Sequence, residues 1–457
     1  MKKFFPAFIF LSAIVLLPSY RLKPRHTSEE RSGLARSSNQ FTFAFFHNLL
    51  KDDVSNRLVS PVGVYLGLNL LYNAAAKETR DSIGQALRVI DMDIRDLNVQ
   101  SRTLMEQFSL SDKKAHFSMA NAIWCNRKKL RLTSSFDELS QRYYYSTVQS
   151  LPFNGKSTAE KINDWITQKS DDHACTVMQS AHPDDMVYMT NACNFYAGWQ
   201  HPFDVSATQE DFFNLRSGHR VVASFMHKVF VARTYSDTSF SMLELPYGNG
   251  DAYSLFIVLP DNFRQSLRDF TASFQGEELF DAMKRMNTQW VDLSLPRWEQ
   301  SMDASDMMPA LGQMGMRILN DRGGYSDLSN MCTKPISGVK NTMDLLMGKY
   351  DADPVRVNTP VAGFYHTACL NVNENGSMMD ITPQADSIVG TGQHRGLPFK
   401  ADRPFLYFVV AKQQQVVLLA GVMNNPGAAV TTTMLHGSSP SRPGGLRLPR
   451  GKQHQKG

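Results

Sequence analysis

The stretch MVYMTNACNFYAGW, Met186 to Trp199, is the most informative part of this sequence for its fold. It is largely apolar and aromatic, and it contains no glycine or proline before Gly198, so it predicts one long strand. Apolar residues would fall on both faces of this extended chain, which is typical of a strand covered on both sides. The stretch therefore predicts the central strand of a large sheet that lies between other layers.

Helices are expected early in the chain and strands late, which is typical of an α+β domain. Ser60 can cap a buried helix whose first residue is Pro61, and Thr79 can cap a second helix over 80–87. Periodic apolar residues predict further helices over 41–50, 158–169 and 303–312. Strands are expected over 116–125, 254–260, 291–296, 364–374, 405–410 and 416–423.

The chain has 457 residues, of which 42% are apolar and 20% charged, with a formal net charge of +5. This balance favours one large globular domain, expected over 40–426, with a surface insertion at 331–360. Residues 1–20 resemble a signal peptide, so the protein is expected to be secreted and extracellular; a short membrane anchor is the alternative. We expect a flexible segment over 21–39 and a disordered basic tail over 427–457.

The five cysteines do not predict a metal site or a complete set of disulfides. Their number is odd and none shows a metal-binding spacing, so buried free thiols are expected. They are Cys125, Cys175, Cys193, Cys332 and Cys369. No metal and no cofactor is predicted.

Motifs of the common enzyme classes are missing from the sequence. It contains no HExxH, no nucleophile elbow and no Walker phosphate loop, so no catalytic residue is assigned. A thiol protease is the enzymatic alternative, although no local signature supports it. The absence of a basic helix or aromatic platform at a recognisable spacing argues against nucleic acid as a partner.

Seven blocks, in order across 41–426, resemble the serpin family of protease inhibitors. They are NRLVSP (56–61), ANAIW (120–124), INDWI (162–166), TNACNFYAGWQHPFD (190–204), LELPYGNGDAYSLFIVLPD (243–261), VDLSLPRW (291–298) and ADRPFLYFVV (401–410). The resemblance implies three β-sheets surrounded by about eight or nine helices. It also implies an exposed reactive loop, here over 374–398, and a serine protease, or alternatively a cysteine protease, as partner.

In the inhibitory members of this family, a protease cleaves the loop and the loop inserts into the largest sheet as a central strand. The family's hinge corresponds here to Glu374, Gly376, Ser377, Met379 and Pro383. Large side chains follow Ser377, where inhibitory members usually have small ones. In a central strand the proline would also lack the N–H that a ladder needs. The alternative is therefore a non-inhibitory serpin that acts as a protease substrate, ligand carrier or chaperone.

Two positions are candidates for the bond that a protease cleaves. Family spacing counted from Gly376 places it between Gly390 and Thr391. Arg395, slightly downstream, would suit a trypsin-like protease, or it is an ordinary solvated charge. The sequence leaves these alternatives open.

The resemblance also implies roles for several polar and aromatic residues. Ser60, Asn191 and His366 resemble a hydrogen-bonded latch beneath the opening of the sheet, and Trp199 is expected near the top of that sheet, close to Glu374. The family usually has a serine where Gly63 stands. Separately from the resemblance, the sequence Asn375-Gly-Ser matches the acceptor pattern for N-glycosylation.

A dense basic patch follows the strand expected over 116–125. It contains Arg127, Lys128, Lys129 and Arg131. Such a patch binds a sulfated polysaccharide through charge, or it is a solvated connection between elements. No stable insertion into a membrane is expected.

Overall fold

The computed structural model describes residues 28–50, 55–110, 114–170, 176–250, 252–323, 326–334, 358–377 and 395–427. Several predictions lie outside these residues and stay predictions. They concern the signal peptide, Cys175, most of the expected insertion, Met379, Pro383, Gly390, Thr391 and the tail from residue 428 on.

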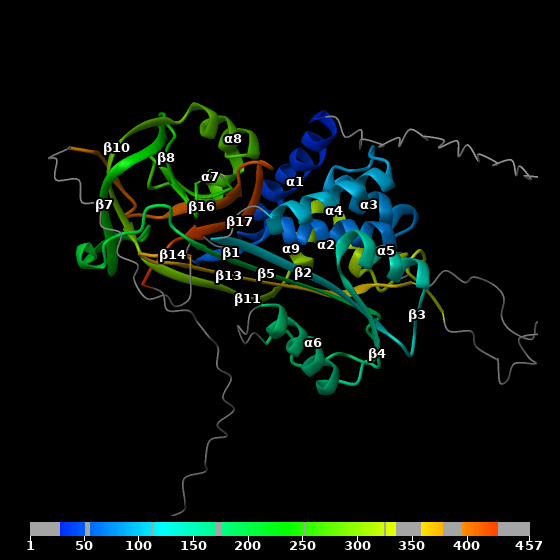
Figure 1. Ribbon diagram of the computed structural model, residues 1–457. Coiled ribbons are helices and arrows are strands. Elements are labelled where there is room, and N and C mark those ends of the chain that lie inside the picture. Colours follow the sequence, from blue (N-terminus) through cyan, green and yellow to red (C-terminus); the bar gives the residue numbers. More distant parts are fainter. Residues whose placement is uncertain are drawn as a thin grey trace, which may run out of the picture.

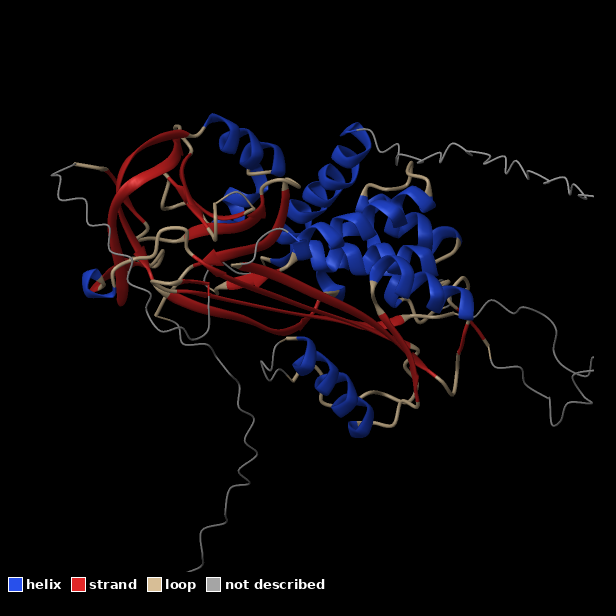
Figure 2. Cartoon of the chain, viewed as in Figure 1, coloured by secondary structure: helices blue, strands red, loops and turns tan. Residues whose placement is uncertain are grey.

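The described residues form nine α-helices and three sheets, which confirms the α+β prediction (Figures 1 and 2). No helix within the described parts of the chain is long and apolar enough to cross a bilayer. The helices are α1 (Ser28–Leu49), α2 (Pro61–Ala74), α3 (Lys77–Leu87), α4 (Ile94–Leu110), α5 (Ser134–Tyr144), α6 (Lys156–Lys169), α7 (Leu267–Ser273), α8 (Gly276–Arg285) and α9 (Met308–Leu311).

The six-stranded sheet contains the central strand predicted from Met186 to Trp199, here β5. Its order is β11-β13-β5-β2-β4, with β14 paired to β5. The strands are β2 (Ala115–Asn126), β4 (Thr147–Leu151), β5 (Val187–Gly198), β11 (Trp298–Asp306), β13 (Val361–Val372) and β14 (Gly376–Ser377).

The nine-stranded sheet has the order β1-β17-β16-β9-β8-β7-β10-β15, with β6 paired to β7. Its strands are β1 (Arg57–Val59), β6 (Gln209–Asn214), β7 (Arg220–Ser236), β8 (Phe240–Pro246), β9 (Tyr253–Pro260), β10 (Asn287–Pro296), β15 (Leu397–Lys400), β16 (Phe405–Ala411) and β17 (Val416–Met423). The third sheet pairs β3 (Arg131–Leu132) with β12 (Cys332–Thr333).

Helices cover the six-stranded sheet on both faces, as the apolar pattern of β5 predicts. Helix α2 lies against one face and every one of its residues is buried. Ser60 caps it by accepting the Gly63 N–H at 3.4 Å, and Pro61 is its first residue, as predicted. Helix α6 covers the opposite face (Figure 2), where Trp165 meets Trp124 edge to face.

Helix α1 starts earlier than the sequence predicts. It begins at Ser28, so residues 28–39 are helical where a flexible segment was expected. The polar residues of this part make tertiary bonds instead of forming an apolar stripe. Asn39, for example, donates from Nδ2 to the Gln415 carbonyl at 2.6 Å. Periodicity alone does not detect a helix that is anchored in this way.

Two further predictions are wrong for tertiary reasons. Helix α3 begins at Lys77, and Thr79 does not cap it but accepts the Asp327 N–H at 2.9 Å. The helix expected over 303–312 begins only at Met308, because β11 continues to Asp306 and pairs with β13. After α9, short irregular helical turns continue to Asn320. Pairing across a sheet overrides the local preference of a short segment.

The ends of the expected 331–360 insertion belong to the core. Met331 and Cys332 are buried, and β12 pairs with β3. Thr359 is also buried, and its hydroxyl accepts the Leu328 N–H at 2.8 Å. An insertion can therefore begin only after the β12 strand and must end before Thr359.

Candidate functional site

Two parallel strands lie side by side in the middle of the six-stranded sheet. Strands β5 and β13 are parallel neighbours, with a register from Val187↔Val361 to Asn194↔Cys369. We call this contact the β5–β13 seam. Above it, Ala197 and Gly198 pair with β14 in the antiparallel direction. β14 has this direction because it follows β13 after a reversal of the chain.

The reversal between β13 and β14 is a tight turn, and Gly376 makes it feasible. The N–H groups of Asn373 and Gly376 each donate to the other residue's carbonyl, at 3.0 and 3.2 Å. Gly376 has a φ of 140°, and a Cβ there would lie 2.1 Å from the Ala197 carbonyl oxygen. Any side chain would collide with backbone, so glycine is required at this position.

Ser377 is already inside the protein. Its side chain is 1% exposed, and its Oγ lies 2.6 Å from the Tyr247 hydroxyl. The Tyr247 ring stacks on Trp199 with 4.4 Å between ring centroids. Burial raises the pKa of Tyr247, which keeps its hydroxyl protonated. The β14 strand therefore pairs with β5 on the same side as β13, directly beyond the end of the β5–β13 ladder.

Side chains hold the turn at Glu374 in place. As predicted, Trp199 lies beside it: its Nε1 donates to the Asn373 carbonyl at 2.7 Å. The Glu374 carboxylate is 5% exposed and accepts from the Thr208 hydroxyl at 2.7 Å. It also pairs with Arg297 at 3.5 Å. Charge and hydrogen bonds thus fix the turn between β13 and β14.

The structure brings Ser60, Asn191 and His366 together across the seam. The Ser60 N–H donates to His366 Nε2 at 2.9 Å, and His366 Nδ1 lies 2.6 Å from Asn191 Oδ1. Because Nε2 accepts, the proton resides on Nδ1. Complete burial lowers the His366 pKa to about 3, so the ring is neutral. We call this trio the latch, since Asn191 is on β5 and His366 is on β13.

Gly63 and Cys193 interlock beneath the latch, a feature that sequence reasoning missed. A Cβ at Gly63 would lie 2.5 Å from Cys193 Sγ and 2.7 Å from Asn191 Oδ1. The Cys193 thiol donates to that same Oδ1 at 3.3 Å. Burial raises the Cys193 pKa to about 12, so it is a packing group and not a nucleophile. In the sequence, the one sign of this contact is that Gly63 stands where the family usually has a serine.

Gly63→Ala is expected to destabilise the native protein by about 1–3 kcal/mol, because the new methyl group overpacks the thiol. Adding Cys193→Ala should recover part of that loss, whereas Cys193→Ala alone should destabilise by leaving a small cavity. Urea denaturation of the four proteins gives the coupling energy. Additive effects of the two changes would contradict the interlock.

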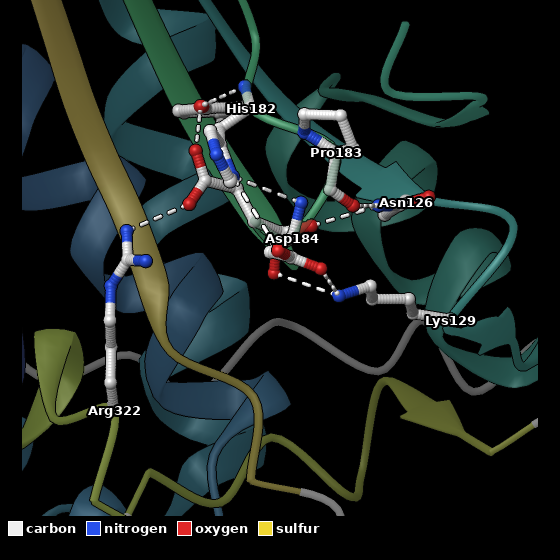
Figure 3. A network of polar contacts seen from close by, with 8 residues as sticks. Asn126, Lys129, His182, Pro183, Asp184 and Arg322 are labelled. Carbon is white, nitrogen blue, oxygen red and sulfur yellow. Dashed lines mark hydrogen bonds and ion pairs between the residues drawn. The ribbon is translucent and has the colours of Figure 1, made fainter.

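A second polar network lies at the other end of β5 (Figure 3). Lys129 Nζ pairs with Asp184 Oδ1 at 2.7 Å, which lowers the Asp184 pKa. Arg322 pairs with Asp185 at 2.8 Å, and Asn126 donates to the Asp185 carbonyl. No sequence motif indicated this network, because its members come from three distant segments.

The network changes the composition of the predicted basic patch. Lys129 is engaged by Asp184, and Lys128 Nζ donates to Asn154 Oδ1 at 3.0 Å. Arg127, Lys128 and Arg131 are exposed. The surface charge of this turn is therefore carried by these three residues.

Arg395, the downstream candidate for the cleaved bond, lies two residues before the edge strand β15. Arg395 itself is exposed, but Gly396 lies so close to β10 that a Cβ there would be 2.4 Å from the Asp292 nitrogen. From Leu397 on, the chain pairs with β10 as the edge strand β15. The residues after Arg395 are thus already paired with β10 or packed against it.

The described residues contain no group of three or more histidine, cysteine or acidic side chains placed to hold a metal. Cys125, Cys193 and Cys332 are buried and Cys369 is partly buried, and all four are free thiols. The buried thiols expected from the sequence are therefore present.

Comparison with known proteins agrees with this architecture. The family model "Serpin (serine protease inhibitor)" matches residues 36–426. Serpin-ZX from Arabidopsis thaliana is 27% identical over 377 residues, which cover 78% of this chain and 88% of that protein.

Solved structures share the fold at lower identity. Human thyroxine-binding globulin, complexed with its ligand, has a TM-score of 0.75 at 18% identity and covers 87% of this chain and 99% of its own. Native protease nexin-1 with heparin has a TM-score of 0.71 at 19% identity and covers 87% and 100%. The match of the family model over most of the chain shows that this protein belongs to the serpin family.

Proposed function

We propose that this protein is a secreted inhibitor of a serine protease, which it traps by inserting its cleaved reactive loop between β5 and β13. The observation that carries the proposal is β14. Ser377 is buried in the core, and its backbone already pairs with Ala197 of β5. Loop insertion then extends an existing strand and does not have to nucleate a new one.

Two opposing terms decide whether insertion succeeds. Opening the seam breaks the β5–β13 ladder and the latch, and ordering the loop costs ~1–2 kcal/mol of backbone entropy per residue. The inserted strand forms a ladder on each side and buries alternate side chains. Trapping also requires insertion to outrun hydrolysis of the acyl-enzyme, and a barrier change of about 1.4 kcal/mol shifts that ratio tenfold.

For the cleaved bond, we favour the position set by family spacing, between Gly390 and Thr391, over Arg395. A protease cleft must surround several residues on both sides of the bond it cuts. After Arg395 those residues are hydrogen-bonded to β10 or packed against it. Mass spectrometry of the cleaved chain identifies the bond directly.

The alternative is a non-inhibitory serpin, and the sequence of the loop favours it. Met379 and Pro383 would both face the core of the opened sheet, and the proline would leave a ladder position without a donor. Thyroxine-binding globulin, one of the structural neighbours, binds a small ligand by its name. In this case the loop would be cut as an ordinary substrate.

Incubation with a panel of serine proteases separates the two functions. An inhibitor forms a 1:1 adduct that survives boiling in detergent, and its cleaved form melts well above its native form. A substrate shows clean cleavage without an adduct. The absence of any adduct across the panel, together with an unchanged melting temperature after cleavage, would refute loop insertion.

We further propose that Arg127, Lys128 and Arg131 bind a sulfated polysaccharide. The structural neighbour protease nexin-1 was solved with heparin. Alanine at all three positions should lower the salt concentration that elutes the protein from immobilised heparin, because fewer counterions are released on binding. The matched control replaces Arg264, Arg268 and Lys284. If the two triple variants elute together, the patch is only a solvated turn.

Asn375 is proposed as a glycosylation site in the secreted protein. It is partly buried within the turn, and its carbonyl accepts the Trp199 N–H at 2.9 Å. A glycan at this position would stand beside the residues that enter the sheet first, and we infer that it would oppose insertion. A mass difference before and after glycosidase treatment checks the modification.

A further inference from the structure

A small pocket opens where strands β7 and β8 separate. Their ladder ends at the pair Thr234↔Leu243. The next two residues, Arg233 and Glu244, are joined by their side chains, with 2.7 Å between Arg233 Nη1 and Glu244 Oε2. Beyond this ion pair lies a pocket of about 230 Å³. We call it the β7–β8 cleft and define it by Gln200, Arg233, Glu244, Pro246, Thr288 and Lys412.

The segment that follows β5 forms another wall of the cleft, and its contacts hold it in place. The Gln200 N–H donates to the Pro246 carbonyl at 2.9 Å, and Lys228 Nζ donates to the His201 carbonyl at 2.9 Å. Gly250 has a φ of 88°, and a Cβ there would lie 2.7 Å from the amide nitrogen of Gln200. The wall is therefore packed in its present position, as is usual for a pre-formed ligand site.

The charges that line the cleft do not balance. The Glu244 carboxylate is 1% exposed and accepts from both Arg233 and Lys412, at 2.7 and 2.9 Å. Two cations thus share one carboxylate. Burial lowers the pKa of His201, so this ring is neutral at pH 7. Among the described residues that line the cleft, one positive charge is left without a counter-charge.

Both cations have more donors than their bonds to Glu244 use. An ammonium carries three N–H donors, and Lys412 gives one to Glu244. A guanidinium carries five, and Arg233 gives one to Glu244 and one to the Met283 carbonyl at 2.7 Å. The Lys412 and Arg233 side chains are 22% and 40% exposed. Their remaining donors are therefore available to a ligand in the cleft.

The volume of the cleft limits the size of its ligand. A site for one water molecule needs only ~10–15 Å³, whereas pockets for drug-sized molecules have about 300–1,000 Å³. The cleft, at about 230 Å³, lies between these limits and suits a molecule of a few heavy atoms. Excess positive charge and several N–H donors favour an oxyanion, because charge-assisted hydrogen bonds to oxygen are the strongest that these groups make.

We propose that the β7–β8 cleft binds a small oxyanion, such as phosphate, sulfate or a short carboxylic acid, through Arg233 and Lys412. The proposal goes beyond protease inhibition and does not depend on it. The cleft is also separate from the latch and from the basic patch of Arg127, Lys128 and Arg131. A bound ion joins the two cations, so it stabilises the native protein by mass action.

Thr288 offers a test that leaves the ion pairs of Glu244 in place. It is exposed and is the direct cross-strand partner of Arg233. Partners across a ladder share a face, with their Cβ atoms about 5 Å apart. Thr288→Glu adds a carboxylate beside the cleft, which repels an oxyanion and competes for Arg233. Thr288→Gln is the matched control, since it has nearly the same shape without the charge.

Isothermal titration calorimetry with inorganic phosphate, sulfate and succinate measures the binding, at an ionic strength held constant with sodium chloride. We expect saturable binding of one ion per chain in the wild type and in Thr288→Gln. The Kd of Thr288→Glu should be higher by about tenfold or more, because repulsion between like charges at this distance exceeds the energy of a tenfold change in affinity.

Variants of Lys412 give a second, independent measurement. Lys412→Gln removes one of the two cations and should raise the Kd by a similar factor, whereas Lys412→Arg keeps the charge and should retain binding. Each Kd is compared with the melting temperature of the same variant without ligand. This comparison separates lost binding from a lost fold, since Lys412 also neutralises the buried Glu244.

Three results would overturn the proposal. One is the absence of saturable heat with all three anions in the wild type. Another is an equal Kd in Thr288→Glu and Thr288→Gln. The third is binding that persists in Thr288→Glu but disappears when Arg127, Lys128 and Arg131 are replaced by alanine, which would assign the anion to the basic patch instead.

Discussion

Ser377→Arg is expected to convert the protein from a trap into a substrate. Ser377 is 1% exposed and bonds the Tyr247 hydroxyl within the core, so an arginine there would have to bury its charge without a partner. That burial costs several kcal/mol. The arginine would stay outside, and the strand would lose its starting point. We expect the adduct fraction to fall by more than tenfold, with the rate of loop attack little changed.

Ser377→Thr is the control for this change. It keeps the hydroxyl and the Asn375 acceptor pattern, whereas the arginine variant removes both. Protein produced without glycosylation excludes a glycan effect. If the arginine variant still forms the adduct at the wild-type fraction, the buried position of Ser377 has no part in insertion.

Acid is expected to destabilise the native protein through His366. Its pKa is about 3 in the folded chain and near 6.5 when unfolded, so both states are neutral above pH 6.5 and stability is complete there. Below pH 6.5 the unfolded chain takes up a proton that the folded chain excludes. The loss is about 1.4 kcal/mol per pH unit down to about pH 3, or roughly 2 kcal/mol at pH 5.

His366→Asn tests this dependence by urea denaturation at pH 7 and pH 5. Asparagine retains a donor for Asn191 but leaves the Ser60 N–H without its acceptor, so the variant should be less stable at pH 7 by about 1–3 kcal/mol. Its further loss between pH 7 and pH 5 should be smaller by roughly 2 kcal/mol. Burial also lowers the pKa of His201. His201→Asn is therefore the control that separates the contribution of His366 to the pH dependence from that of this second histidine. Equal pH dependence in wild type and His366→Asn would remove the assignment.

The hinge illustrates which structural features the family resemblance and the residue chemistry can predict and which they cannot. The resemblance implied a hinge at Glu374, Gly376 and Ser377, and in the structure these residues lie in the turn after β13 and in the short strand β14. It did not indicate that Ser377 is already buried, because burial depends on Tyr247, which lies 130 residues away. The sequence left Arg395 open as a bait residue or an ordinary solvated charge, and the close approach of Gly396 to β10 is a tertiary feature that no local pattern indicated.

The sequence by itself determined the helices and strands that depend on interactions between residues close together in the chain. Ser60 and Pro61 start α2, and the uninterrupted apolar run of β5 makes a strand covered on both faces. Only the tertiary structure decided the start of α1, the extension of β11 into a segment expected to be helical, and the fit of Gly63 against Cys193. The reason is that capping and periodicity act over a few residues of chain. Steric fit, strand pairing and burial join residues that only the completed fold brings within contact distance.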